Sequence, residues 1–150
     1  MKKNDTERMT IVIGASRLGA TIASAKSASG AYTSIIDKNP LAFRKLDSSY
    51  SGYQIEGDAE DMDVLEKANA RGAKEFDIMT ESDDENLYLA AICLVCFDAP
   101  LIVVRLQDEK KSVLLDDKRI RFITPSLLSY RAYQEIQDAF ADVSSEGEKR

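Results

Sequence analysis

Three small residues at positions 14, 16 and 19 follow a short apolar segment and could together hold a phosphate group. Gly14, Ser16 and Gly19 form the pattern Gly-x-Ser-x-x-Gly directly after Ile-Val-Ile at 11–13. A strand that passes through such a turn into a helix presents backbone N–H groups to a phosphate. The full dinucleotide-binding fingerprint has glycine at the middle position, where Ser16 stands here. The Ser16 side chain would crowd the backbone approach that glycine permits, although its hydroxyl could donate to a phosphate oxygen instead.

An acidic residue closes the next apolar segment, Ser-Ile-Ile-Asp at 34–37. A carboxylate about 20 residues beyond the glycine loop is where a ribose hydroxyl binds in this kind of site. Such a carboxylate also repels a 2′-phosphate, which favours NAD or an unmodified adenine nucleotide over NADP. Alternatively, Asp37 only starts the turn Asp-Lys-Asn-Pro. The loop and Asp37 together predict an adenine-nucleotide site.

Arg17 lies inside the glycine loop, at the first turn of the predicted helix. The helix dipole disfavours a cation at this end, so some further interaction is expected to hold the residue there. One interpretation is a guanidinium fork that binds a terminal phosphate. The other is a solvated arginine that pairs with Asp37 or Asp58. The spacing alone leaves both open.

Polar residues also stand at the ends of the later apolar segments. Asp58 follows the third segment, Thr80 follows the fourth, and Arg105 ends the fifth. Asp58 either accepts from an adenine amine or makes a turn, and Arg105 either faces the ligand or forms an ion pair. Asp83 and Asn86 either contact ligand or cap a helix. With the loop, the candidate binding residues are Gly14, Ala15, Ser16, Arg17, Leu18, Gly19, Asp37, Lys38, Gly57, Asp58, Ala59, Thr80, Asp83, Asn86 and Arg105.

Strand and helix patterns alternate along the chain with short connections. The strands are apolar runs with little alternation, which is typical of a parallel sheet covered by helices on both faces. The pattern predicts a doubly wound, Rossmann-like α/β fold with about six strands, which binds ligands beyond the carboxyl ends of its strands. Predicted strands lie near 9–14, 32–37, 53–56, 76–80, 101–105 and 121–123, and predicted helices near 17–29, 40–47, 61–69, 84–97, 109–116 and 126–140.

Composition excludes several classes of function. The chain has 150 residues, enough for one domain with a sizeable core, and a net charge of −6. Without a basic field, neither a nucleic acid nor an anionic membrane surface is an expected partner. There is no histidine, the commonest general base and metal ligand. The two cysteines, Cys93 and Cys96, fall on an apolar helix without further zinc ligands, so we predict neither a metal site nor a catalytic residue.

The chain divides into a polar arm at 1–8, one nucleotide-binding domain at 9–141 and a disordered tail at 142–150. The polar start lacks an apolar stretch behind its charges, and no apolar run has membrane length. We therefore expect a cytoplasmic protein without direct membrane insertion.

These motifs, in this order, resemble the RCK N-terminal domain, also called TrkA-N or KTN, the regulatory domain of potassium channels and transporters. The resemblance covers residues 9–137. Departures occur at Ser16 and at Ser126, where some members have a glutamate that helps to hold a metal ion. The resemblance rests on the glycine loop, Ile36-Asp37, Gly57-Asp58-Ala59, Thr80-x-x-Asp83-x-x-Asn86 and Val103-Val104-Arg105.

The resemblance implies a ligand, partners and residue roles. The ligand would be an adenine nucleotide, NAD/NADH or ATP/ADP. The partners would be an integral-membrane potassium channel or transporter subunit and further copies of the chain, in a dimer or a dimer-based ring. The last helix, with Leu128, Ala132, Ile136 and Phe140 at spacings of four, would cross to a neighbouring copy. The implied roles are phosphate loop for Gly14, Ser16 and Gly19, terminal-phosphate contact for Arg17, ribose contact for Asp37, adenine contacts for Asp58 and Ala59, and pocket lining for Thr80.

The favoured hypothesis is a non-enzymatic, cytoplasmic regulatory subunit, peripheral to the inner face of the membrane, that gates potassium transport by a conformational change. The alternative is an NAD-dependent oxidoreductase or its cofactor-binding half. The absence of histidine and of a substrate domain weighs against that alternative. A third hypothesis, suggested by Ser16, is a scaffold whose nucleotide pocket has decayed.

Overall fold

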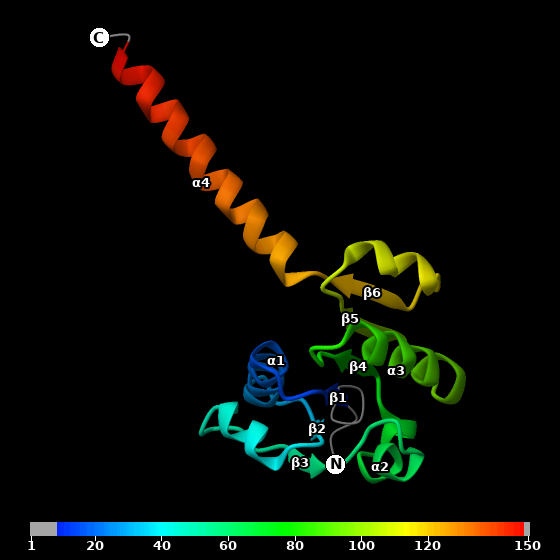
Figure 1. Ribbon diagram of the computed structural model, residues 1–150. Coiled ribbons are helices and arrows are strands. Elements are labelled where there is room, and N and C mark those ends of the chain that lie inside the picture. Colours follow the sequence, from blue (N-terminus) through cyan, green and yellow to red (C-terminus); the bar gives the residue numbers. More distant parts are fainter. Residues whose placement is uncertain (1–8, 149–150) are drawn as a thin grey trace.

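Six parallel strands form a single sheet in the order β3-β2-β1-β4-β5-β6 (Figure 1). This computed structural model describes residues 9–148, so the predicted arm at 1–8 lies outside it. The strand order reverses at β1, which lies between β2 and β4, and this confirms the predicted doubly wound fold. The strands are β1 (Thr10–Ile13), β2 (Thr33–Asp37), β3 (Tyr53–Glu56), β4 (Glu75–Ile78), β5 (Leu101–Arg105) and β6 (Ile120–Ile123).

Helical segments make the crossovers between strands. Two segments predicted as helices, 40–47 and 109–116, are six-residue 3₁₀ helices instead. In each, the side chain of the residue before the helix, Asn39 or Asp108, accepts a hydrogen bond from the N–H two positions further on and fixes the first turn. The elements are α1 (Arg17–Ala28), η2 (Pro40–Lys45), α2 (Met62–Lys67), η3 (Ala70–Gly72), α3 (Asp83–Cys96), η4 (Glu109–Leu114) and α4 (Pro125–Glu148).

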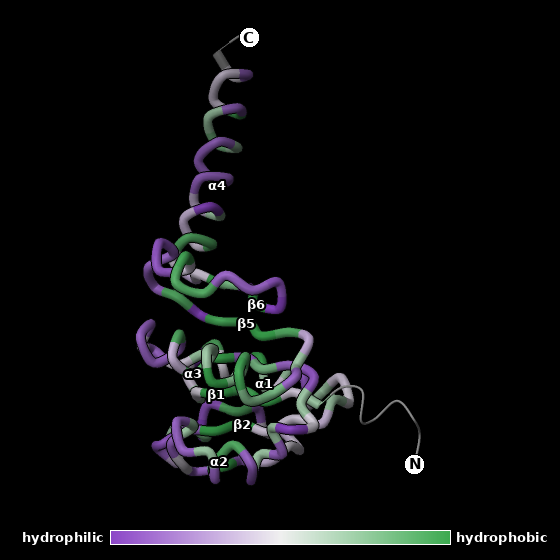
Figure 2. Tube along the Cα trace, turned by 90° about the vertical axis from the view of Figure 1, so that its right-hand side faces the viewer, coloured by the Kyte–Doolittle hydropathy of each residue, from purple (hydrophilic) through white to green (hydrophobic). Residues whose placement is uncertain are grey.

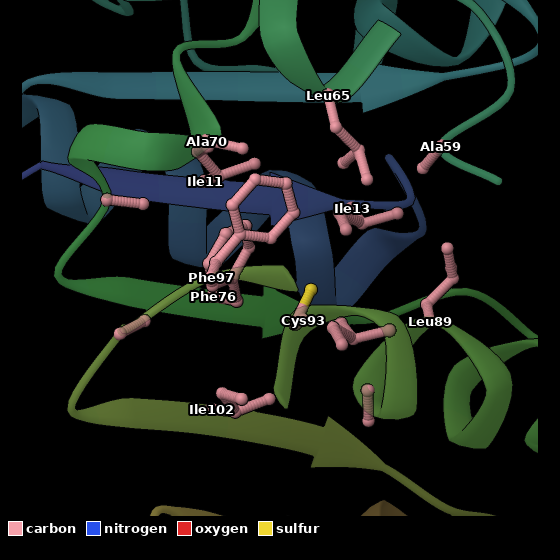
Figure 3. Close-up of a cluster of buried hydrophobic side chains, with 14 of the residues drawn as sticks. Ile11, Ile13, Ala59, Leu65, Ala70, Phe76, Leu89, Cys93, Phe97 and Ile102 are labelled. Atoms are coloured by element: carbon pink, nitrogen blue, oxygen red, sulfur yellow. The ribbon is translucent and has the colours of Figure 1, made fainter. Parts of the chain in front are cut away.

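The main core lies between the sheet and the helices α2 and α3 (Figure 3). Strand residues such as Ile11 and Phe76 are fully buried there, and the Phe76 and Phe97 ring centroids lie 5.5 Å apart. Cys93 is buried in this core, whereas Cys96 at the end of α3 is exposed. Because the core fixes β1 and β4 side by side, it fixes the two strand ends that border the predicted ligand crevice.

A smaller core lies on the opposite face, under α1 and η2. Val12 and Ile35 point toward this side, and α1 meets them with Ala23. Gly19 and Ala20 on α1 are also buried. Small residues on the inner side of α1 let its backbone approach the sheet closely, which sets the position of its N-terminus at the end of β1.

The last helix, α4, leaves the sheet and projects from it (Figure 1). It is longer than the predicted helix at 126–140 and continues to Glu148, so most of the segment expected as a disordered tail is helical. Figure 2 shows α4 as hydrophobic at its base and mostly hydrophilic beyond it, with short hydrophobic stretches. No helix among residues 9–148 has both the length and the apolarity to cross a membrane. The exposed apolar residues of α4 are Leu128, Tyr130, Tyr133, Ile136, Phe140 and Val143.

Candidate nucleotide-binding site

The glycine loop passes tightly over the end of β4. Gly14 has a φ of +95°, and a Cβ built there would lie 2.7 Å from the backbone nitrogen of Thr80. A Cβ on Gly19 would lie 2.0 Å from the Gly14 oxygen. Both positions therefore require glycine for the turn itself, which is the strand-to-helix geometry that the motif predicts.

Ser16, the departure from the fingerprint, is used inside the protein. Its hydroxyl donates to the Met79 carbonyl oxygen at 2.6 Å and accepts from the Gly19 N–H at 3.1 Å. The residue is buried and is the N-cap of α1. Since a hydroxyl has one proton, Ser16 has none left for a phosphate oxygen in this arrangement. Its side chain turns toward β4, so it does not crowd the loop as the sequence suggested.

Asp37 ends β2 with both carboxylate oxygens turned to backbone N–H groups. One oxygen accepts from the Ala15 N–H at 2.7 Å, and the other accepts from the Asn39 N–H at 2.8 Å. The second contact is the turn that the alternative interpretation expected. The first contact places the carboxylate directly beside the glycine loop, as a ribose-binding acid requires. The turn is therefore observed, and ribose binding by Asp37 stays a prediction.

A cavity of about 110 Å³ lies at this edge of the sheet. The segments that line it are the ends of β1, β2 and β4 and the turn after β3, at the point where the strand order reverses. Six of the predicted residues line it. Sequence analysis missed Ile13, Ile36 and Glu85, although Glu85 lies inside the motif at 80–86. The lining consists of Ile13, Gly14, Ile36, Asp37, Lys38, Gly57, Ala59, Thr80 and Glu85.

Lys38 joins two sides of this crevice. Its ammonium lies 3.1 Å from a Glu85 oxygen on α3 and 3.8 Å from an Asp58 oxygen after β3. The hydrogen bond donated to Glu85, with the nearby carboxylates, raises the pKa of Lys38. Carboxylate oxygens of Asp58, Glu60 and Glu85 lie within 4.8 Å of one another, so Lys38 offsets a local excess of negative charge.

Asn86 and Asp83 contact backbone in the structure. Asn86 is fully buried; its oxygen accepts from the Thr80 N–H at 3.1 Å, and its amide donates to the oxygens of Thr80 and Arg105 at 3.0 and 2.9 Å. Asp83 accepts from the N–H groups of Gln107 and Asp108 at 2.7 and 3.0 Å. Asn86 thus holds the ends of β4 and β5 together, and Asp83 fastens the segment after β5 to the start of α3.

The two predicted arginines occupy different surroundings. Arg17 is exposed at the start of α1, and within residues 9–148 it forms no ion pair with Asp37 or Asp58. Arg105 is half-buried and donates to the Thr80 carbonyl oxygen at 3.5 Å, with its Nε buried and unpartnered within the same residues. Neither arginine lines the cavity; nor does Leu18, which is half-buried on α1.

Several curated proteins are similar to this chain in sequence. The chain is 31% identical over 107 residues to the Trk system potassium uptake protein TrkA homolog of Pyrococcus horikoshii, a match that covers 71% of this chain and 47% of the relative. The chain spans less than half the length of the curated relatives it matches.

Two solved structures have the same fold. The TrkA-N domain of inner membrane protein ybaL from Escherichia coli has a TM-score of 0.75 at 14% identity, over 86% of this chain and 96% of that one. The Kef CTD of Shewanella denitrificans, in an AMP-bound form, has a TM-score of 0.66 at 22% identity, over 93% and 92%. The family model of the TrkA-N domain matches residues 10–124, which include β1 to β6 and the whole crevice. The chain therefore belongs to the TrkA-N domain family.

Proposed function

We propose that this chain is a non-catalytic cytoplasmic regulatory domain that binds an adenine nucleotide in the crevice and gates a potassium channel or transporter. The observation that carries the proposal is the position of Asp37, whose carboxylate lies 2.7 Å from the Ala15 N–H of the glycine loop. A ribose hydroxyl can replace that N–H as donor to the carboxylate. The released N–H then faces the first phosphate, next to the N-terminus of α1.

The ligand class follows from the same contacts. A carboxylate that accepts ribose hydroxyls favours nucleotides without a 2′-phosphate, such as NAD, NADH, ATP or ADP. The Kef CTD, which shares the fold, was solved in an AMP-bound form. This supports an adenine nucleotide as the ligand.

A regulatory role fits the chemistry of the crevice better than catalysis. Its titratable side chains are Asp37, Lys38 and Glu85, and each is engaged with a backbone N–H or with an opposite charge. The sequence offers no histidine as a proton carrier. A ligand that favours one of two subunit arrangements can act on a partner without being converted.

The partners are inferred from the curated relatives and from α4. The Pyrococcus horikoshii relative is named as a potassium uptake protein, so we infer a potassium channel or transporter subunit as the partner. On α4, Leu128, Ile136 and Phe140 are 49%, 66% and 72% exposed. Residues at spacings of four share one side of a helix, and burying such a stripe favours association with a second copy of the chain.

Isothermal titration calorimetry with adenosine, AMP, ADP, ATP, NAD and NADH tests the nucleotide. The variant Asp37→Asn is expected to weaken binding at least tenfold. Asp47→Asn is the matched control, because Asp47 also accepts turn hydrogen bonds, from Ser49, but lies outside the crevice. Failure of all six ligands to bind would refute the proposal. Substrate-dependent oxidation of NADH would favour an oxidoreductase instead.

A further inference from the structure

Lys45 is a cation beside the glycine loop that no sequence motif singles out. It is the last residue of η2, and its ammonium donates to the Ala15 carbonyl oxygen at 3.0 Å, across 30 positions of the chain. Ala15 itself is buried in the loop. The two polar groups of Ala15 are thus held by β2 and the segment after it, since Asp37 accepts from its N–H and Lys45 donates to its oxygen.

Lys45 differs in its charge partners from Lys38, the lysine that lines the crevice. Lys38 is paired with Glu85 and Asp58. Neither Lys45 nor Arg17 forms an ion pair with any carboxylate among residues 9–148. A neutral carbonyl leaves the charge of an ammonium uncompensated, and a phosphate oxygen is a stronger acceptor for it.

We propose that Lys45, beside the crevice, binds a phosphate group of the nucleotide, so that the site selects phosphate-bearing adenine nucleotides over adenosine. This inference rests on the proposed function. Lys45 and Arg17 come from different elements and supply two positive charges around the loop, in addition to the partial charge of the α1 N-terminus. The flexible stem of a lysine lets its ammonium move from the Ala15 oxygen to a phosphate.

A structural role for Lys45 makes a different prediction. If the ammonium only anchors η2 to the loop, its loss would disturb the loop equally for every ligand that uses Asp37. A phosphate contact acts on charged ligands alone. The ratio of the affinities for ADP and adenosine therefore separates the two roles, whereas the free energy of unfolding does not.

The experiment titrates adenosine, AMP, ADP and ATP into the full chain and its variants by calorimetry. Lys45→Gln is expected to weaken the binding of ADP and ATP at least fivefold and the binding of adenosine less than twofold. Lys45→Arg keeps the charge, so its affinities for ADP and ATP are expected to stay within threefold of those of the parent chain. Arg44→Gln, which removes the same charge from the neighbouring position of η2, is expected to leave all affinities within twofold.

Several outcomes would overturn the inference. If Lys45→Gln weakens the binding of adenosine and ADP equally, Lys45 has a structural role. If it weakens the binding of neither ligand, Lys45 has no part in binding. Binding of adenosine by the parent chain as tightly as ADP would refute the preference for phosphate-bearing ligands. Each of these results leaves adenine-nucleotide binding intact, whereas absence of binding by every ligand would refute the proposed function and this inference together.

Discussion

The Ser16 hydroxyl and the Met79 carbonyl oxygen, 63 positions apart in the chain, are joined by a hydrogen bond of 2.6 Å. The bond ties the glycine loop to the end of β4, while the same hydroxyl caps α1 through the Gly19 N–H. A glycine at position 16 could make neither contact. The serine is thus a structural element of this loop.

Ser16→Ala is expected to lower the free energy of unfolding by about 1–2 kcal/mol, because the helix loses its cap and the Met79 oxygen loses a donor. Urea denaturation measures this. Ser29→Ala removes an exposed hydroxyl that donates to the Lys26 oxygen, and its effect is expected to stay below about 0.5 kcal/mol. Equal effects of the two variants would contradict the buried role of Ser16.

Asn86→Ala is expected to lower the free energy of unfolding by more, about 3 kcal/mol, because a fully buried side chain is lost and three half-buried backbone groups of Thr80 and Arg105 lose their partner together. Gln107→Ala, which removes an exposed donor to the Glu81 oxygen, serves as the control. If Asn86 serves mainly the ligand, its removal would weaken nucleotide binding while leaving the denaturation midpoint unchanged.

Asp77 predicts a pH dependence of stability. It is a buried carboxyl in β4 with one oxygen unpartnered within residues 9–148. Burial raises its pKa from 3.8 to about 7, the negative charge of Glu75 adds to the rise, and Lys26 opposes it. The folded chain therefore holds a proton that the unfolded chain releases between these two pKa values, so this contribution to stability falls as the pH rises toward 7.

Asp77→Asn removes that dependence. Between pH 5 and pH 8 the parent chain is expected to lose about 2 kcal/mol more unfolding free energy than the variant. Urea denaturation of both proteins at the two pH values measures the difference. Parallel pH profiles would show that Asp77 is ionised in the fold at pH 5.

Glu85→Gln is expected to strengthen binding of ADP two- to fivefold, because it releases Lys38 from its closest carboxylate at the crevice. The free energy of unfolding is expected to change by less than about 1 kcal/mol, since the Lys38 side chain is more than half exposed and water can solvate its ammonium. Glu81→Gln, with the same change of charge just before α3, controls for the overall field. Equal strengthening by both variants would argue against a specific contact.

The sequence predicted those features that depend on residues close together along the chain. The strand–loop–helix around Gly14, the acid at Asp37 and the six apolar runs are local patterns, and each has its expected place in the fold. The contact of Ser16 with Met79 and that of Lys45 with Ala15 join distant segments. No local pattern encodes such a contact.

Two further features were missed for other reasons. Asp77 stands in an otherwise apolar run, and its burial follows from the helices and strands packed around β4. The extension of α4 to Glu148 runs through a polar segment that composition alone assigned to a tail. The segment 142–148 continues the helix that begins at Pro125, although its serines and its glycine are weak helix formers and suggested disorder.

The length of α4 has a mechanical consequence. Its 24 residues begin two positions after β6 ends, at the same edge of the sheet as the crevice. At the rise of an α-helix this gives a lever about 36 Å long, so a tilt of roughly 5° at its base moves its tip by about 3 Å. A displacement too small to disturb the sheet would thus reach a second protein at the far end of α4 as a movement comparable to the width of an atom.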